Sequence, residues 1–135
     1  MTARLPRILL AEDDRFLRKA AEAALTRKGY DVVAAADGAE ALSQAGQQKP
    51  DLILLDVIMP KLQGYEVLKR LKADPATSDI PVIMMSNLAQ EADIREALDA
   101  GAVSYLVKSN VGLAQLIAKV SEALAARGVS ATATS

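Results

Sequence analysis

Residues 51–60 spell Asp-Leu-Ile-Leu-Leu-Asp-Val-Ile-Met-Pro, and this stretch decides the fold class. Leu52 to Leu55 form an uninterrupted apolar run of strand length, and Asp56 follows the run directly. A strand that helices cover on both faces is continuously apolar, whereas a strand with one wet face alternates. The stretch therefore predicts a central strand of a parallel sheet, with a carboxylate at its C-terminal end.

Other β-rich runs lie on both sides of this strand and alternate with longer segments of helical period. We expect strands at Arg7 to Ala11, Asp31 to Ala35, Leu52 to Asp56, Pro81 to Ser86 and Ser104 to Lys108. Strands that alternate with helices are typical of a parallel sheet wrapped by helices. The sequence thus predicts one α/β domain over residues 1–127, followed by a flexible tail of small and polar residues over 128–135.

The expected helices have apolar stripes and clear ends. Gly29 is expected to end the first helix, and Asp37-Gly38 to begin the second. Two stripes at helical spacing are expected to face the core: Phe16, Leu17, Ala20, Ala21, Ala24 and Leu25 in the first helix, and Leu113, Leu116, Ile117, Val120 and Leu124 in the last.

Composition excludes several kinds of chemistry. The chain has 135 residues with no Cys and no His, which removes thiolate nucleophiles, imidazole bases and the usual zinc ligands. A formal charge of -1 argues against direct nucleic-acid binding by the chain as a whole. Acidic residues interrupt the N-terminal apolar run, and no stretch reaches the roughly 20 apolar residues of a membrane span. We therefore expect a cytoplasmic protein without membrane insertion.

The residues at the C-terminal ends of the expected strands carry the chemistry. Parallel strands bring these ends to one edge of a sheet, where ligands bind in open α/β folds. The side chains placed there are Glu12, Asp13 and Asp14 after the first strand, Asp56 after the third, Ser86 after the fourth and Lys108 after the fifth. Each has an ordinary structural explanation when taken singly, as a helix cap, a turn residue or a surface residue.

Taken together, these side chains need a cation. Two like charges about 4 Å apart repel by roughly 4 kcal/mol at an effective dielectric constant near 20, and Lys108 alone cannot offset three carboxylates. Mg²⁺ favours carboxylates, carbonyls and waters, so it suits such a cluster. Asp14 is expected to cap the first helix, and Ile58 could contribute only its main-chain carbonyl.

At this point the sequence resembles the response-regulator receiver family, over roughly Pro6 to Arg127. The segments that carry the resemblance are Ile8 to Asp14, Leu54 to Pro60, Gly64 to Glu66, Pro81 to Ser86 and Gly101-Ala102 with Tyr105 to Lys108. The resemblance implies a flavodoxin-like, doubly wound sheet of five parallel strands in the order 2-1-3-4-5, with five helices. Each segment is a weak signal alone, but their order and spacing together are specific.

The resemblance also implies roles for individual residues. Asp56 corresponds to the phosphoacceptor, and Glu12 and Asp13 hold Mg²⁺ together with Asp56 and the Ile58 carbonyl. Ser86 and Lys108 bind the phosphoryl group, and Ser86 and Tyr105 act as switch residues. A histidine kinase or histidine phosphotransfer protein is the implied donor, and the downstream protein is unknown. No enzymatic activity is implied beyond self-catalysed phosphoryl transfer and slow dephosphorylation.

The sequence departs from the family pattern at several positions. Ser109 replaces the usual proline after a cis peptide, which predicts either a trans bond with a shifted loop or a strained cis bond. Asn87 and Gln63 replace a small residue and an Asp. Ile58 and Leu88 flank the expected phosphate with apolar side chains, so we hypothesise that the aspartyl phosphate decays slowly.

Alternative functions remain open at this point. The first is a pseudo-receiver that binds proteins without phosphorylation. A flavodoxin-like electron carrier would need a hydroxyl- or Gly-rich loop after the first strand, where this chain has three acids. A phosphatase with an Asp nucleophile would place that Asp after the first strand, whereas the candidate acceptor of this chain, Asp56, follows the third. Tyr105 could also be a core aromatic that packs on Leu98 or Ile94.

Overall fold

The computed structural model describes residues 5–87, 90–110 and 112–127. Strands and helices alternate along the chain. The elements are β1 (Arg7–Ala11), α1 (Arg15–Arg27), β2 (Asp31–Ala35), α2 (Gly38–Gln48), β3 (Leu52–Asp56), α3 (Gly64–Ala73), β4 (Val82–Ser86), α4 (Glu91–Asp99), β5 (Ser104–Val107), the 3₁₀ helix η1 (Lys108–Asn110) and α5 (Leu113–Ala126). The expected tail at 128–135 lies outside the described residues.

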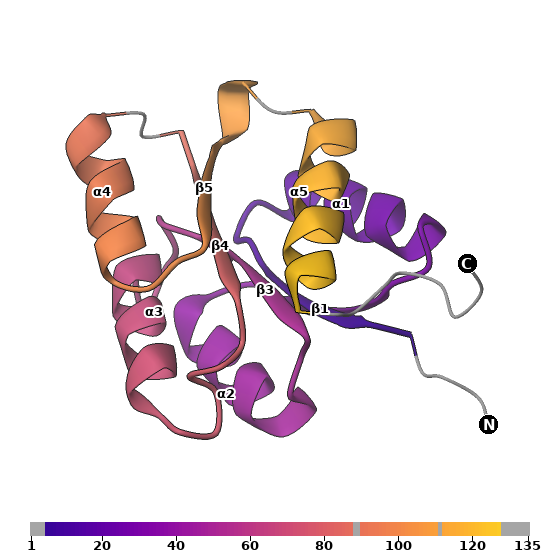
Figure 1. Cartoon of the computed structure of the whole chain (residues 1–135). Coiled ribbons are helices and arrows are strands. Elements are labelled where there is room, and N and C mark those ends of the chain that lie inside the picture. Colours follow the sequence, from indigo (N-terminus) through magenta and orange to yellow (C-terminus); the bar gives the residue numbers. More distant parts are fainter. Residues whose placement is uncertain (1–4, 88–89, 111, 128–135) are drawn as a thin grey trace.

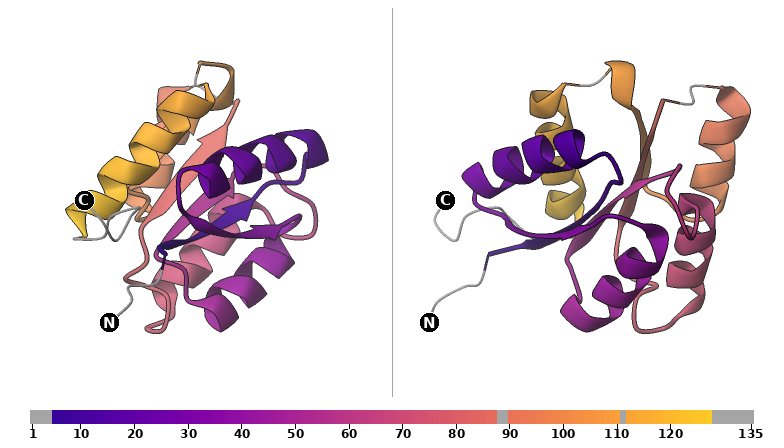
Figure 2. Two further views of the ribbon diagram at one scale, coloured as in Figure 1. Left: turned by 90° about the vertical axis from the view of Figure 1, so that its right-hand side faces the viewer. Right: turned by 180° about the vertical axis from the view of Figure 1, so that it is seen from behind.

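All strands are parallel, in the order β2-β1-β3-β4-β5 (Figure 1). Helices α1 and α5 cover one face of the sheet, and α2, α3 and α4 cover the other (Figures 1 and 2). The predicted doubly wound, flavodoxin-like fold is therefore confirmed. No helix of the described part of the chain is long and apolar enough to cross a membrane.

The strand that decides the fold lies in the centre of the sheet, and all of its residues are buried. Its side chains point alternately to the two faces, as strand geometry requires. Ile53 and Leu55 pack under α2, α3 and α4, whereas Leu52 and Leu54 pack under α1 and α5. An uninterrupted apolar run satisfies both layers at once, which explains why this strand shows no alternation in sequence.

Local signals at the helix ends agree with the structure. Asp14 caps α1, since its Oδ1 accepts a hydrogen bond from Leu17 N at 3.1 Å. Gly29 follows the end of α1 with a φ of 100°. Asp37 caps α2, with Oδ1 2.8 Å from Glu40 N. The expected boundaries at these three positions are confirmed.

Two strand boundaries differ from the expectation. β4 begins at Val82 rather than Pro81, because proline has no N–H to donate to the ladder. β5 ends at Val107, and Lys108 instead begins a 3₁₀ helix. No cis peptide occurs among the described residues, so the Lys108–Ser109 bond is trans. Of the two predicted alternatives for this bond, the structure has the trans bond.

One expectation about the core is wrong. Phe16, Leu17 and Leu113 were assigned to core stripes, but they are 82%, 44% and 44% exposed. All three lie in the first turn of a helix, at the edge of the sheet where the strands end (Figure 1). Only the later turns of α1 and α5 lie over the sheet, where residues such as Leu25 and Val120 are fully buried.

Candidate functional site

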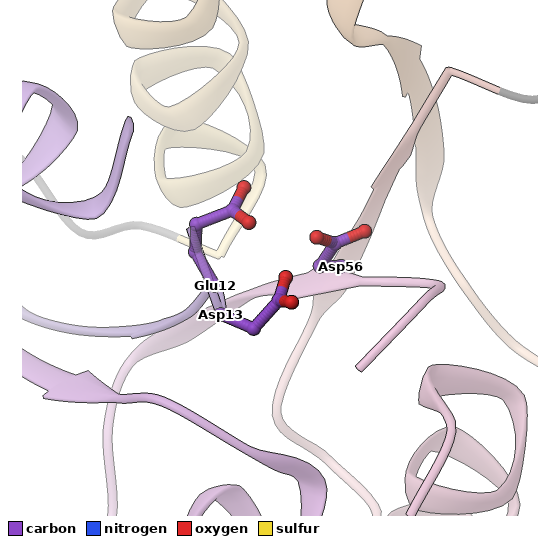
Figure 3. Close-up of side chains that lie close together, drawn as sticks. All are labelled: Glu12, Asp13 and Asp56. Carbon is purple, nitrogen blue, oxygen red and sulfur yellow. The ribbon is translucent and has the colours of Figure 1, made fainter. Parts of the chain in front are cut away.

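Three carboxylates meet at the C-terminal edge of the sheet. β1 pairs with β3 with Ala11 opposite Leu55, so the residues that follow, Glu12 and Asp56, emerge side by side. Glu12, Asp13 and Asp56 each offer a carboxylate oxygen, and these oxygens lie within 4.8 Å of one another (Figure 3). Glu12 and Asp56 are each only 3% exposed, while Asp13 is open to solvent. The structure thus brings the predicted acidic cluster together.

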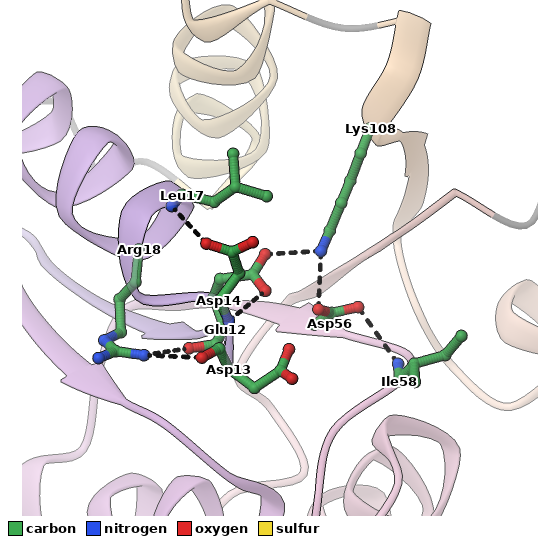
Figure 4. Close-up of polar contacts among 8 residues, drawn as sticks. All are labelled: Glu12, Asp13, Asp14, Leu17, Arg18, Asp56, Ile58 and Lys108. Carbon is green, nitrogen blue, oxygen red and sulfur yellow. Dashed lines mark hydrogen bonds and ion pairs between the residues drawn. The ribbon is translucent and has the colours of Figure 1, made fainter.

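Lys108 bridges two of these carboxylates. Its Nζ lies 2.6 Å from Glu12 Oε1 and 2.7 Å from Asp56 Oδ2 (Figure 4). The side chain reaches the cluster from the start of η1, immediately after β5. Its expected position beside the acidic residues is therefore correct, although it comes from a 3₁₀ helix and not from a strand.

The pKa values of Glu12 and Lys108 reflect their surroundings. Burial is the main cause that raises the pKa of Glu12 above its ordinary value, and the neighbouring Asp56 raises it further; the hydrogen bond from Lys108 opposes this rise without cancelling it. Burial lowers the pKa of Lys108, but its hydrogen bonds to Asp56 and Glu12 outweigh burial and raise it overall. Lys108 therefore remains protonated. Its positive charge does not fully offset the cost of burying the Glu12 carboxylate.

The backbone around the cluster is well fixed. Arg18 Nη1 donates to the carbonyl of Glu12 at 2.8 Å and to that of Asp13 at 3.3 Å (Figure 4). Glu12 Oε2 accepts from Asp14 N at 3.1 Å. Arg18 thus binds main-chain oxygens and leaves the Asp13 carboxylate available to solvent. Within the cluster, Lys108 supplies one positive charge against three carboxylates.

This donor set fits a hard divalent cation. The three clustered side chains offer only oxygen ligands, and the excess of negative charge that Lys108 leaves would be neutralised by Mg²⁺. The loop after Asp56 lies beside the cluster, because Ile58 N donates to Asp56 Oδ1 at 3.2 Å. Carboxylates at two neighbouring strand ends and an adjacent main-chain loop are the components that a magnesium site needs.

Ser86 and Tyr105 lie on the neighbouring strands. Ser86 ends β4, next to β3, and is 1% exposed. Tyr105 lies on β5, packs against the core under α2, α3 and α4, and shares a hydrogen bond with Ser86. Burial raises the pKa of the Tyr105 hydroxyl, and the hydrogen bond with Ser86 lowers it in part. Tyr105 is thus a half-buried core aromatic that is also connected to the site hydroxyl.

Reasoning from sequence missed an apolar border around the site. Leu17 and Leu113 line a cavity of about 100 Å³ between α1 and α5, which Glu12 and Lys108 also line. The neighbouring Phe16 is 82% exposed. Ile58, which the sequence already indicated as an apolar neighbour of the site, is 54% exposed beside Asp56. Leu17 and Leu113 lie in the first turns of α1 and α5, and helical periodicity alone does not show that these turns border the site.

Comparison with known proteins agrees with this geometry. Residues 8–121 match the family model of the response regulator receiver domain. The chain is 45% identical over 107 residues to the gliding motility regulatory protein of Myxococcus xanthus, covering 79% of this chain and 14% of that protein. It is 42% identical over 130 residues to the transcriptional regulatory protein PrrA of Mycobacterium tuberculosis, covering 96% of this chain and 54% of that protein.

Solved structures show the same fold. The receiver domain of the Francisella response regulator 1452 superimposes with a TM-score of 0.83 at 32% identity, covering 91% of this chain and 98% of that chain. The chemotaxis protein CheY4 of Vibrio cholerae gives 0.82 at 28% identity, covering 87% and 98%.

The chain belongs to the response regulator receiver domain family, whose members act in two-component signalling and receive phosphate from histidine kinases. It spans about half or less of the length of the two curated relatives described above. The family resemblance predicted from sequence is confirmed.

Proposed function

We propose that Asp56 accepts a phosphoryl group from the phosphohistidine of a histidine kinase or histidine phosphotransfer protein, with Mg²⁺ bound beside it. The observation that carries this proposal is the cluster of Glu12, Asp13 and Asp56 at the C-terminal edge of the sheet. The 135 residues contain no His, so the donor histidine lies outside them. This role places the protein in the cytoplasm.

Glu12, Asp13, Asp56 and the Ile58 carbonyl would hold the ion. Bound Mg²⁺ supplies positive charge that neutralises the carboxylates and the incoming phosphoryl oxygens. The protein's own contribution is to fix these donors. Arg18 secures the main chain of Glu12 and Asp13, and the Ile58 amide orients Asp56.

Asp56 would act as the nucleophile. One of its carboxylate oxygens forms a P–O bond as the P–N bond of the phosphohistidine breaks, and the donor imidazole leaves with the electron pair and is neutralised by a proton from solvent. Lys108 already lies 2.7 Å from Asp56 Oδ2, where an ammonium stabilises the charge of a transferring phosphoryl group. Catalysis is limited to this self-phosphorylation and to slow loss of the group.

Phosphorylation would then change the surface around α4, β5 and α5. A phosphoryl group adds nearly two negative charges and strong acceptor oxygens. Ser86 and Lys108 turn toward these oxygens, which removes the Ser86 partner of Tyr105 and one partner of Glu12. Because Tyr105 lies on β5, the switch reaches the surface that a downstream protein would bind.

One observation favours the alternative function, a pseudo-receiver that binds proteins without phosphorylation. Lys108 partly neutralises the acidic cluster without any metal. The two functions differ in one titration. Isothermal titration calorimetry with Mg²⁺, followed by beryllofluoride, should show binding of both by wild type and by Asp14→Asn, a neighbouring acid that caps α1. Asp56→Asn should lose beryllofluoride binding. Wild type that binds neither ligand would establish the pseudo-receiver instead.

A further inference from the structure

The loop that follows Asp56, residues 57–63, contains an unusual turn. Leu62 N donates to the carbonyl of Pro60 at 2.7 Å, and the residue between them, Lys61, has a φ of 68°. A hydrogen bond across three residues with a positive central φ defines the strained form of γ-turn, which is rare. Residues held in this region persist only where surrounding structure supports them. This turn lies directly beyond Ile58, so its support bears on the site.

The support comes from the N-terminus of α2, a segment remote in sequence. Gly38 N donates to the Pro60 carbonyl at 3.4 Å, and Asp37 Oδ2 lies 3.5 Å from Lys61 Nζ. A Cβ atom at Gly38 would lie 1.9 Å from the Leu62 carbonyl oxygen and 2.7 Å from Leu62 Cβ. The obstacle is main chain, so it cannot rotate away. Position 38 therefore needs glycine because of this close approach.

The start of α2 is itself firmly built. Asp37 Oδ1 accepts from Glu40 N at 2.8 Å, and Glu40 Oε1 accepts from Ala36 N at 2.6 Å. These reciprocal bonds resemble a capping box and fix the first turn of the helix. Because Asp37 and Glu40 fix the start of α2, a side chain at position 38 would displace the loop after Asp56 more readily than the helix.

The other end of the loop is held in the same way. Gly64 N donates to the Val57 carbonyl at 2.8 Å. A Cβ atom at Gly64 would lie 2.2 Å from the Asp56 carbonyl oxygen. Two helix starts therefore clamp the segment between them, and Ile58 lies inside the clamped segment.

We propose that Gly38 is a positioning residue for the phosphorylation site: by admitting the Leu62 carbonyl, it lets α2 hold the loop that places Ile58 beside Asp56. This inference rests on the proposed function, because it assigns Gly38 a part in forming the magnesium site. Gly38 touches neither the ion nor the phosphoryl group. It acts through the loop.

The experiment compares Gly38→Ala with Gly46→Ala. Both glycines lie in α2, but a Cβ at Gly46 meets no atom within 4 Å. Mg²⁺ affinity is measured by calorimetry, and the free energy of unfolding by urea titration in EDTA. G46A should keep wild-type affinity and gain stability from the better helix propensity of Ala. G38A should lose about tenfold or more in Mg²⁺ affinity, a difference of about 1.4 kcal/mol.

A double variant separates positioning from stability. The double variant is G38A/Lys61→Gly. Glycine at position 61 tolerates a positive φ, so the turn at residues 60–62 can move away from the methyl group introduced at position 38. The free energy of unfolding should then return toward the wild-type value. Mg²⁺ affinity should stay low, because the loop is then displaced. Recovery of affinity together with stability would overturn the proposal, as would a folded G38A that binds Mg²⁺ like G46A. Failure of wild type and G46A to bind Mg²⁺ would overturn the proposed function as well.

Discussion

Lys108 Nζ lies 2.6 Å from Glu12 Oε1, so the cation supplied by the protein occupies the same acidic cluster that a metal ion would enter. The same ammonium lies 2.7 Å from Asp56 Oδ2. Under the proposed function, Lys108 would therefore compete with Mg²⁺ for negative charge before phosphorylation. The two cations would act together only when a phosphoryl group adds new acceptor oxygens.

Removing the lysine charge should strengthen metal binding. Lys108→Gln leaves three carboxylates without their internal cation, so Mg²⁺ affinity should rise by about threefold or more. Phosphorylation by acetyl phosphate should slow at saturating Mg²⁺, because the ammonium no longer stabilises the transferring group. Calorimetry and intact-mass kinetics measure the two effects. Lys119→Gln, on the exposed side of α5, is the control. Weaker Mg²⁺ binding by K108Q would contradict the competition.

Glu12 should make stability depend on pH in the absence of metal. Its raised pKa means that the folded state holds this proton more tightly than the unfolded state. The free energy of unfolding contributed by Glu12 therefore falls as pH rises above the ordinary value of 4.5 through the raised one. Glu12→Gln should be more stable than wild type at neutral pH in EDTA, and the difference should shrink as pH falls toward 4.5.

Urea titrations at both pH values measure this difference, with Glu22→Gln on α1 as a control outside the cluster. Saturating Mg²⁺ should reverse the order at neutral pH, because only wild type keeps the full set of carboxylates. An E12Q variant that is less stable than wild type at neutral pH in EDTA would show that the ion pair with Lys108 outweighs the cost of burial.

The parallel α/β fold could be predicted because it depends on short-range patterns, whereas the strand order that places β1 beside β3 was implied only by the family resemblance. Leu52 to Leu55 are apolar without interruption since β3 is covered on both faces. Once β1 and β3 are neighbours, Glu12 and Asp56 must emerge together. Parallel topology thus converts separate acidic residues into one cluster.

What the sequence did not reveal depends on where elements end in space. Helical periodicity shows which face of α1 is apolar, but not that Phe16 extends beyond the sheet. The contact between Gly38 and Leu62 joins segments that no local pattern relates. The position of Lys108 beside the acidic residues was expected, but its direct ion pair with Glu12 and its place in η1 were not.

The exposed Phe16 should matter for a protein donor and not for a small one. Its side chain is 82% exposed on the first turn of α1, three residues after Asp13 in the sequence. Phe16→Ala removes no core packing, so stability and phosphorylation by acetyl phosphate should stay unchanged. Phosphotransfer from a histidine kinase that phosphorylates wild type should slow by about tenfold, since exposed aromatics often dominate binding energy at interfaces. Leu98→Ala, 45% exposed on α4, is the control. Equal losses in both variants would contradict this role.

Ile58 should lengthen the life of the aspartyl phosphate. Its apolar side chain is 54% exposed beside Asp56 and cannot orient an attacking water molecule. Ile58→Asn should therefore shorten the phosphoryl half-life severalfold, measured after removal of the donor. Val103→Asn, 53% exposed just before β5, should leave it unchanged. A half-life in I58N equal to or longer than that of wild type would contradict the hypothesis.

The most direct test is intact-protein mass spectrometry after incubation with acetyl phosphate, in Mg²⁺ and in EDTA. The account predicts one added phosphoryl group in wild type with Mg²⁺, almost none in EDTA, and none in Asp56→Asn under either condition. Equal phosphorylation in EDTA, or modification that persists in D56N, would contradict the claim that a metal-loaded acidic cluster prepares Asp56 as the acceptor.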